Sequence, residues 1–357
     1  MPNTAKSKSY YRREILPTPE SLVENGKIHF GTFNAPFRNV NPLDAARVFG
    51  FPLPRFLINM RLKEWEAFQL GNDDFFILAV IYNQKVGTLV QFILCDKKNN
   101  RMTKYEKKVP SWRTRVPSSL GDTRARYVSD HFRLDIHNML DRGRIFIDVA
   151  IDGGRKLPPL YEHFEAFHEK GTARPLVVSL PFASNRGMYS HKCLMPMEGV
   201  LFSGGRRIDF ERKNSFAIVD DHKGYYPYIL KYDWVTGAGF TAKGLTGFNL
   251  TDNQVPDRER FNENCLWAGK ELHLLPPVTF SRPNGVHDEW SIRDRHGMVD
   301  ITFTPVFDNP LKMNLVMIKT DYHGPFGHYN GVIRTPRGEK ISVKGFYGMG
   351  EQKYFRG

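Results

Sequence analysis

Acidic, basic and aromatic side chains are grouped most densely in one short stretch of the sequence, from Asp220 to Tyr226, which reads DDHKGYY. Carboxylates next to a histidine and a lysine change one another's pKa values, and general acid–base catalysis depends on such changes. Asp221 and His222 are therefore candidate catalytic residues. A charged loop between two strands would have the same composition, so the pattern also fits a purely structural role.

A third candidate catalytic residue is Glu263, which lies between Asn262 and Asn264, directly before the apolar sequence CLW at 265–267. A carboxylate at the beginning of a buried strand is costly unless it has hydrogen-bond partners. Glu263 is thus either exposed and without a role, or buried and functional. Alternatively, the two asparagines serve only to satisfy the backbone of a loop.

Aromatic residues recur at even-numbered positions between 226 and 234, and side chains two residues apart in a strand lie on the same face. Such a row could line a ligand cavity or fill the core of a barrel. We expect Tyr232, Trp234 and Glu263 to lie near one cavity in the C-terminal half, with the Tyr232 hydroxyl as an orienting donor. The candidate ligand-binding residues are Tyr226, Tyr228, Tyr232, Trp234, Asn264 and Trp267.

Patterns typical of metal or cofactor sites are weak. The three cysteines, Cys95, Cys193 and Cys265, are far apart and form no C-x-x-C pair, which disfavours a zinc ribbon or a disulfide framework. His323 and His328 are five residues apart and have no directly adjacent acidic or thiol partner. We therefore predict no metal and no cofactor, and we expect a reducing compartment.

Basic residues dominate one window of the chain. Residues 97–126 hold ten lysines and arginines against two acidic residues, so they contribute +8 to the net charge of +13. Basic residues around an exposed Trp112 suit an anionic membrane surface or a phosphate group, although a solvated face of a sheet would look the same. No nucleic-acid-binding module surrounds the window, which disfavours nucleic acid as a partner. We expect an exposed positive patch that includes Lys104, Lys107, Lys108, Arg113 and Arg115.

The elements that must position these residues are mainly β-strands. The 357-residue chain is 41% hydrophobic and 13% aromatic, which is enough for a sizeable core. Short apolar or alternating runs such as 73–82, 86–96 and 131–138 are separated by Asn, Asp and Gly, a pattern typical of antiparallel meanders. Appreciable helices are expected only near 41–50 and 157–170.

These elements predict an all-β protein of two consecutive antiparallel β-barrels or sandwiches with few short helices. Residues 1–26 form an N-terminal extension, 27–174 the first barrel domain and 175–357 the second. A closed barrel has no exposed sheet edges and can enclose a cavity, which is the default ligand site. The sequence contains neither a secretory signal nor an apolar run long enough to span a membrane, so we expect a soluble, cytoplasmic protein.

Several motifs occur in an order that resembles one known family, and they extend over nearly the whole chain. The opening LPTPESLVENGKIHFGTFNAP (16–36) is followed by KGYYPYILKYDWVTGAG (223–239), GLTGFNLTDN (244–253), ENCLWAGKELHLL (263–275), WSIRDRHGMVDITFTP (290–305) and GPFGHYNGVIRTPRGEKISVKGFYGMGE (324–351). These motifs resemble the domain of unknown function 2804 family. That family is distantly similar to the tandem lipocalin-like barrels of carotenoid 1,2-hydratases and fungal Diels–Alder-type cyclases.

The resemblance implies lipocalin-like barrels and an apolar ligand, but it assigns no catalytic residue. The leading hypothesis is a protein that binds an apolar or amphipathic, lipid- or isoprenoid-like small molecule. A hydratase, isomerase or cyclase that uses Asp221, His222 and Glu263 without a cofactor is the alternative. A second alternative is a peripheral membrane or interaction protein that uses the window 97–126.

Overall fold

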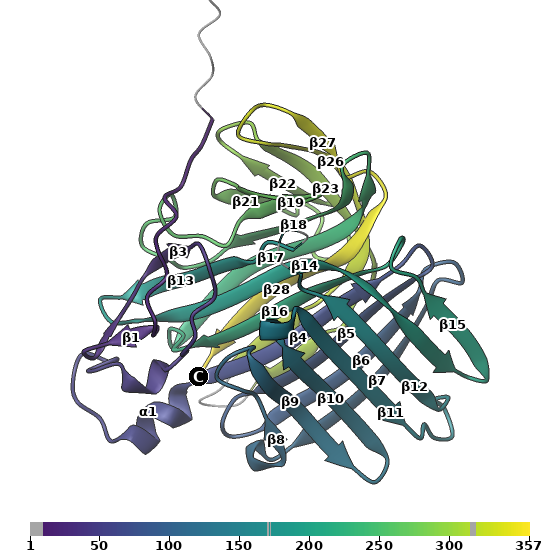
Figure 1. The fold of residues 1–357 in the computed structure, drawn as a ribbon, viewed down its shortest axis with the longest axis horizontal. Helices are drawn as coiled ribbons and strands as arrows, with labels where there is room; N and C mark the ends of the chain where they lie inside the picture. The colour runs from purple at the N-terminus through teal and green to yellow at the C-terminus, as the bar shows by residue number, and fades with distance from the viewer. Residues whose placement is uncertain (1–9, 170, 172, 315–318) are drawn as a thin grey trace, which may run out of the picture.

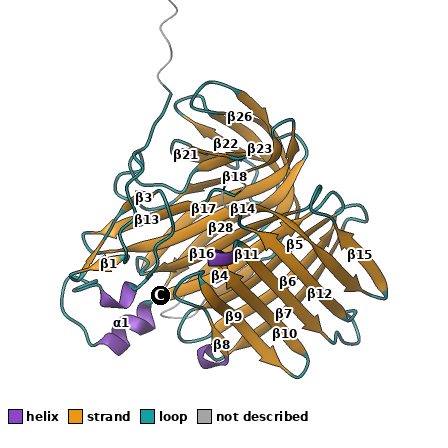
Figure 2. Ribbon diagram, viewed as in Figure 1, coloured by secondary structure: helices purple, strands orange, loops and turns teal. Residues whose placement is uncertain are grey.

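The structure is a computed structural model, and it describes residues 10–169, 171, 173–314 and 319–357. β-Strands dominate it in two large antiparallel sheets (Figures 1 and 2), which confirms the all-β prediction. The helical segments are short: η1 (Pro42–Asp44), α1 (Arg55–Arg61), η2 (Ser111–Arg113) and η3 (Leu140–Arg142). None of the described helices has the length and apolar character needed to traverse a lipid bilayer.

The first sheet follows the order β7-β6-β5-β4-β16-β14-β12-β11-β10-β9-β8, with β3, β13 and β15 attached beside β14. A separate small hairpin, β1 (Val23–Glu24) and β2 (Lys27–Ile28), precedes it. The strands of the first sheet are β3 (Gly31–Phe33), β4 (Lys63–Gly71), β5 (Phe75–Asn83), β6 (Thr88–Asp96), β7 (Arg101–Val109), β8 (Thr114–Arg115), β9 (Asp122–Ser129), β10 (Phe132–Met139), β11 (Arg144–Ile151), β12 (Leu160–Phe167), β13 (Leu176–Ala183), β14 (Arg186–Ser203), β15 (Arg206–Phe210) and β16 (Phe216–Gly224).

The second sheet follows the order β20-β19-β18-β17-β28-β26-β23-β22-β21, with β24, β25 and β27 at its side. Its strands are β17 (Ile229–Thr241), β18 (Gly244–Asp252), β19 (Cys265–Ala268), β20 (Glu271–Leu274), β21 (Val278–Ser281), β22 (Trp290–Asp294), β23 (Val299–Phe307), β24 (Leu311–Asn314), β25 (Lys319–His323), β26 (Phe326–Arg334), β27 (Lys340–Ser342) and β28 (Phe346–Arg356). Both sheets curl, and each encloses a core of its own.

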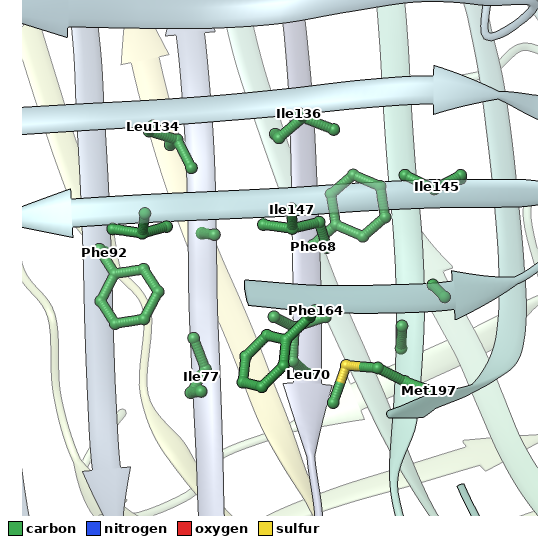
Figure 3. Close-up of a cluster of buried hydrophobic side chains, with 14 of the residues drawn as sticks. Phe68, Leu70, Ile77, Phe92, Leu134, Ile136, Ile145, Ile147, Phe164 and Met197 are labelled. Carbon is green, nitrogen blue, oxygen red and sulfur yellow. The ribbon is translucent and has the colours of Figure 1, made fainter. Parts of the chain in front are cut away.

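The core of the first sheet is the cluster shown in Figure 3, where Phe68, Phe92, Ile147 and Met197 lie close together. The second sheet encloses a corresponding core that includes Trp290 and Phe303. A third apolar cluster joins side chains of β5, β6 and β16 to side chains of β17, β26 and β28, so it lies between the two sheets. The apolar side chains thus form two barrel interiors and one interface.

The long strand β14 curls the first sheet, because its first part pairs with β13 and β16 and its second part with β12 and β15. At Gly199 the backbone has a φ of 148°, and a Cβ atom there would lie 2.2 Å from the carbonyl oxygen of His163. Only glycine allows β14 to approach β12 so closely.

Of the two helix predictions, that for 157–170 is wrong, and that for 41–50 corresponds only to a short 3-10 helix. Residues 157–170 contain strand β12, whose buried Leu160, Phe164 and Ala166 alternate with more exposed residues as in any half-buried strand. In 41–50 the helix is limited to the three residues of η1, because the Asn41 side chain does not cap it. Instead, Asn41 accepts a hydrogen bond from the Val23 amide and donates one to the Val23 carbonyl oxygen, at 2.9 and 3.1 Å. Helix α1 has no counterpart among the predicted elements.

The chain passes from the first sheet to the second between Gly224 and Ile229. The composition predicts a domain boundary at residue 174, and strands β13 to β16 follow that position. In the structure these four strands belong to the first sheet, in which β16 pairs with β4 along nine residues from Phe216 to Gly224. Residues 175–224 therefore complete the first barrel.

Candidate functional site

A cavity of about 230 Å³ lies between the two sheets rather than inside either barrel. One wall is formed by β4 to β7 and the other by β17, β24, β25 and β28. Aromatic and aliphatic side chains cover much of both walls, and a few charged groups lie among them. The lining residues include Trp65, Ala67, Gln69, Leu78, Val80, Tyr82, Leu89, Gln91, Lys104, Glu106, Lys108, Asp220, Tyr232, Trp234, Leu311, Thr320, Tyr322, Met349, Glu351, Lys353 and Phe355.

The strand register explains why these residues share a face. Asp220 in β16 lies opposite Ala67, which lies opposite Val80, and this row continues through Gln91 to Glu106. All five residues line the cavity. Because neighbouring strands are about 4.8 Å apart, the row extends about 19 Å across the sheet. The wall is therefore long enough for an extended ligand.

A buried polar cluster lies at the β16 end of this wall, centred on the imidazole of His222. Its Nε2 atom is 2.9 Å from Asp220 Oδ1, 3.3 Å from Glu263 Oε1 and 2.9 Å from the hydroxyl oxygen of Ser190. Asp220 Oδ1 also accepts a hydrogen bond of 2.5 Å from the Lys192 ammonium. His222, Glu263 and Lys192 are each less than 5% exposed. Four groups that can carry or exchange a proton, namely His222, Asp220, Glu263 and Lys192, thus meet in a buried position at the edge of a cavity.

Aromatic rings fix the orientation of the imidazole. The Trp65 ring stacks on His222 with centroids 4.3 Å apart and an angle of 10° between the planes. On the other ring nitrogen, Nδ1, the Tyr226 hydroxyl lies at 3.4 Å. A second cavity of about 40 Å³ adjoins this cluster and shares Trp65, Asp220, Tyr232, Trp234 and Glu351 with the larger cavity. The cluster therefore borders the space that a ligand would occupy.

Asp220 and Lys192 form a permanent ion pair. Burial alone would raise the pKa of Asp220, but the charges of Lys192 and His222 outweigh it and hold that pKa well below its usual range. Burial would likewise lower the pKa of Lys192, yet the carboxylates of Asp220 and Glu263 raise it. Asp220 consequently stays ionised and cannot supply a proton.

Glu263 lies against the imidazole of this cluster. Its Oε1 atom is buried and makes no hydrogen bond among the described residues, and its nearest basic neighbour is His222 Nε2, at 3.3 Å. On the opposite wall, the Glu351 carboxylate accepts hydrogen bonds from the hydroxyls of Tyr232 and Tyr322, at 2.7 and 2.8 Å. Tyr232 thus already has an acceptor, which fixes its hydroxyl at the cavity wall.

Asp221, the acidic candidate next to Asp220, lies on the other face of β16. It pairs with Lys223 at 2.5 Å and faces Glu66, whose carboxylate also accepts a hydrogen bond from Asn138. Burial, together with the Asp221 charge, raises the pKa of Glu66 to about 8. Burial also raises the pKa of Asp221. The structure therefore separates Asp221 from His222 and Glu263 and places it in a second buried cluster, towards the first barrel interior.

The predicted ligand-binding residues divide into two groups. Tyr226, Tyr232 and Trp234 line one or both cavities, together with Glu263. The other three do not line either cavity. Tyr228 is 47% exposed, Asn264 binds the Thr251 amide and the Pro276 carbonyl oxygen, and Trp267 donates to the Arg174 carbonyl oxygen. Asn264 thus satisfies a loop backbone, as the structural alternative for this motif predicts.

The five residues of the predicted basic patch lie on both faces of β7 and in the segment that follows it. Lys104 and Lys108 line the large cavity, and both pair with Glu106, at 2.8 and 3.5 Å. Lys107 points to the opposite face of β7 and is exposed. Arg113 and Arg115 are also exposed, next to Trp112, which is 83% exposed. Strand alternation thus sends Lys104 and Lys108 to the inter-sheet face, where Lys104 is half-buried and Lys108 is still exposed. The single positive patch stays a prediction.

One group of side chains could hold a divalent cation, namely His287, Asp308 and His323, whose donor atoms lie within 4.8 Å of one another. Two nitrogens and one carboxylate oxygen are ligands that Zn²⁺ accepts. The same contacts also form a hydrogen-bonded cluster without a metal, since His323 Nδ1 is 2.6 Å from Asp308 Oδ2 and the Gly324 amide donates to Oδ1.

Sequence reasoning missed Asp220, Lys192, Trp65, Glu351 and Lys353 as site residues. Asp220 belongs to the same DDHK motif as two of the candidates. Because side chains two residues apart in a strand share a face, the sequence could have placed Asp220 beside His222. The other four come from strands β4, β14 and β28. Only the pairing of β16 with β4 and β14, and of β28 with β17, brings them to the cavity.

Two curled antiparallel sheets in one chain, each around its own core, define a protein with two lipocalin-like barrels. Within this class the chain belongs to the family defined by the domain of unknown function DUF2804, whose model matches residues 12–356. This assignment confirms the family resemblance stated above.

Similar folds occur among solved structures. One belongs to a protein named as an AttH candidate from Nitrosomonas europaea, which is 13% identical with a TM-score of 0.51, and the match covers 83% of this chain and 93% of that one. Another is kievitone hydratase from Nectria haematococca, which is 11% identical with a TM-score of 0.49, over 82% and 88% of the two chains. At these identities the first similarity concerns the fold alone. No curated protein matches the chain.

Proposed function

We propose that the protein binds an apolar or amphipathic small molecule in the cavity between its two sheets. The observation that carries this proposal is the cavity of about 230 Å³, whose walls combine Trp65 and Trp234 with aliphatic side chains such as Leu78 and Val80. Burial of a ligand there would contribute about 0.8 kcal/mol for each methylene group removed from water. The few polar groups of the wall would orient the ligand.

The experiment combines native mass spectrometry of the purified protein with binding of the neutral dye Nile red. We expect the mass spectrum to show a retained apolar species. Leu89 is a half-exposed residue of β6 that lines the cavity, so the larger side chain of Leu89→Trp should fill part of the cavity and weaken dye binding at least tenfold. Val128→Trp is the matched control, because Val128 is exposed on β9. Equal dye binding by both variants and the wild type would exclude the cavity as the site.

A second candidate function, acid–base catalysis on the bound molecule, is favoured by the His222–Glu263 contact beside the cavity. In a hydration, Glu263 would donate a proton to one carbon of a double bond. Water would add to the other carbon and lose a proton to His222, and the return of that proton to Glu263 would complete the cycle. Asp220 would stabilise the imidazolium that forms.

Glu263→Gln tests the catalytic candidate, with an extracted pool of apolar metabolites as substrate. We expect the variant to lose turnover but to keep its affinity for Nile red. Glu66→Gln is the matched control, because that carboxyl group is similarly buried but lies on the face of the first sheet that is turned away from the cavity. Turnover that survives in Glu263→Gln would remove Glu263 from the mechanism, and binding without any turnover would leave the protein a binding protein.

A further inference from the structure

One lysine of the cavity wall differs from the others in its surroundings. The Lys353 ammonium lies 5.2 Å from the ring centroid of Tyr82, 5.5 Å from that of Tyr232 and 5.9 Å from that of Tyr322. Tyr232 and Tyr322 lie directly opposite Lys353 on the strands to either side of β28, and Tyr82 comes from the facing sheet. Three rings from two sheets therefore hold one cation in place.

Lys353 forms no ion pair with a carboxylate among the described residues, whereas the other two lysines of the cavity wall, Lys104 and Lys108, are already paired. Lys104 and Lys108 both contact the Glu106 carboxylate. The carboxylate nearest to Lys353 along its own strand, Glu351, is occupied by two tyrosine hydroxyls. Tyrosine rings orient an ammonium group and attract it, but they do not neutralise it. The cavity thus presents a fixed, half-buried cation beside apolar walls.

We infer that the cavity selects an amphipathic anion, with a carboxylate head group bound by Lys353 and an apolar chain packed along Leu89, Met349 and Phe355. This inference rests on the proposed function and specifies its ligand class. A carboxylate that reaches Lys353 gains a charge-assisted hydrogen bond in a poorly hydrated place, where such a bond is stronger than in water. An alcohol of equal length gains only the packing of its chain. A single fixed ammonium suits a head group that carries one negative charge.

The test compares dodecanoate with 1-dodecanol by isothermal titration calorimetry on the full chain, with tryptophan fluorescence as a second readout because Trp65 and Trp234 line the cavity. We expect wild-type protein to bind dodecanoate at least tenfold more tightly than 1-dodecanol. Lys353→Met, which keeps the length of the side chain but removes its charge, should reduce this preference to less than threefold. In that variant the affinity for 1-dodecanol should remain unchanged.

Lys231→Met is the matched control. Lys231 belongs to the neighbouring strand β17 and also lies over a tyrosine ring, that of Tyr354, at 5.7 Å. It lines an adjacent cavity of about 490 Å³, which Lys353 also lines, but it does not line the cavity of about 230 Å³. This control should keep the full preference for dodecanoate.

Two outcomes would contradict the inference, and they are distinguishable. Equal affinity of wild-type protein for the two probes, or a preference that persists in Lys353→Met, would overturn the role of Lys353 and leave the proposed function intact. Failure of both probes to bind would overturn the proposed function for this ligand class, and the inference with it. Unchanged thermal unfolding of Lys353→Met would show that the comparison is made on folded protein.

Discussion

The pKa values of two consecutive acidic residues of β16 are shifted in opposite directions, because the strand sends their side chains to opposite faces. Asp220 contacts Lys192 and His222 and stays ionised, whereas burial raises the pKa of Asp221. The sequence shows which residues alternate, but it does not show which set faces the ligand, since a shift of one residue exchanges the two faces. For this reason the sequence was sufficient to identify the motif, but it was not sufficient to decide which of the two aspartates faces the cavity.

The first prediction concerns the Asp220–Lys192 pair. The pKa of Asp220 is lower in the folded protein than in the unfolded chain, so the pair stabilises the fold above about pH 4, the unfolded value, and this contribution is lost as the pH falls through the folded pKa. Asp220→Asn should therefore be less stable than the wild type at pH 7 and approach it at pH 2. Urea unfolding at both pH values measures the difference, and a constant difference would show that Asp220 does not titrate in this way.

A related prediction concerns Lys192→Met, which leaves the Asp220 carboxylate buried without its cationic partner. Breaking a buried pair from one side costs about 3–5 kcal/mol, whereas replacing both partners is often nearly neutral. We expect the double variant Lys192→Met, Asp220→Asn to recover most of the stability that the single variant loses. Urea unfolding of the three proteins at pH 7 gives the coupling energy. Strictly additive effects would mean that the two groups do not interact.

The second buried cluster predicts the opposite pH dependence. The pKa of Glu66 is raised to about 8 in the fold, from about 4.3 when unfolded, so stability falls as the pH rises between these values. Glu66→Gln removes this loss and should be more stable than the wild type at pH 8, by at most about 5 kcal/mol, since each of the roughly 3.7 pKa units corresponds to about 1.4 kcal/mol. Thermal unfolding at pH 5 and pH 8 checks this. A wild type that is more stable at pH 8 would contradict it.

Strand identity was easier to predict than helix identity. The runs 73–82 and 86–96 correspond to β5 and β6, because long β-branched and aromatic runs bounded by turn residues have few alternatives. Strand β12 was missed because Phe164 and Phe167 are three residues apart, as in a helix, while the buried Glu162 hid the alternation. A buried carboxylate inside a strand is an exception that no sequence pattern signals.

The close approach of β17 to β28 supplies a test at the scale of an element. A Cβ atom on Gly348 would lie 1.9 Å from the Thr236 carbonyl oxygen, so the strands must separate to accommodate any side chain. We expect Gly348→Ala to lower the free energy of unfolding by about 1–3 kcal/mol, the usual cost of overpacking. Gly154→Ala is the control, since nothing lies within 4 Å of its added Cβ. Equal stability of both variants would show that β28 can shift at little cost.

For the whole molecule, the sequence predicted two barrels but not the interface between them, because contacts between distant strands leave no local pattern. The membrane alternative has also changed, since Lys104 and Lys108 line the cavity. The predicted patch residues that lie outside the cavity are Lys107, Arg113 and Arg115, all of them exposed. If this alternative holds, changing these three residues to Glu should reduce sedimentation with phosphatidylserine liposomes at low salt, and wild-type binding should weaken as salt rises.

The control for that prediction carries the same change of charge elsewhere on the surface, at the exposed residues Arg337, Lys340 and Lys344. It should bind the liposomes as the wild type does. Equal losses in both triple variants would indicate attraction by net charge alone, and wild-type protein that stays in the supernatant would leave these residues with a role in solubility.

The pairing of β4 with β16 also determines the order in which the chain can fold. Strand β4 (Lys63–Gly71) can pair with β16 (Phe216–Gly224) only after that strand, about 150 positions later in the sequence, has been synthesised. The sheet of the first barrel is incomplete until then. Contacts between such distant segments are slow to form, because closing the intervening loop costs entropy before any contact compensates for it. During synthesis the apolar strands β5 and β6 therefore emerge well before their sheet is complete. Nascent chains that stop near residue 174 should remain sensitive to protease and depend on chaperones, while chains that extend past residue 224 become resistant.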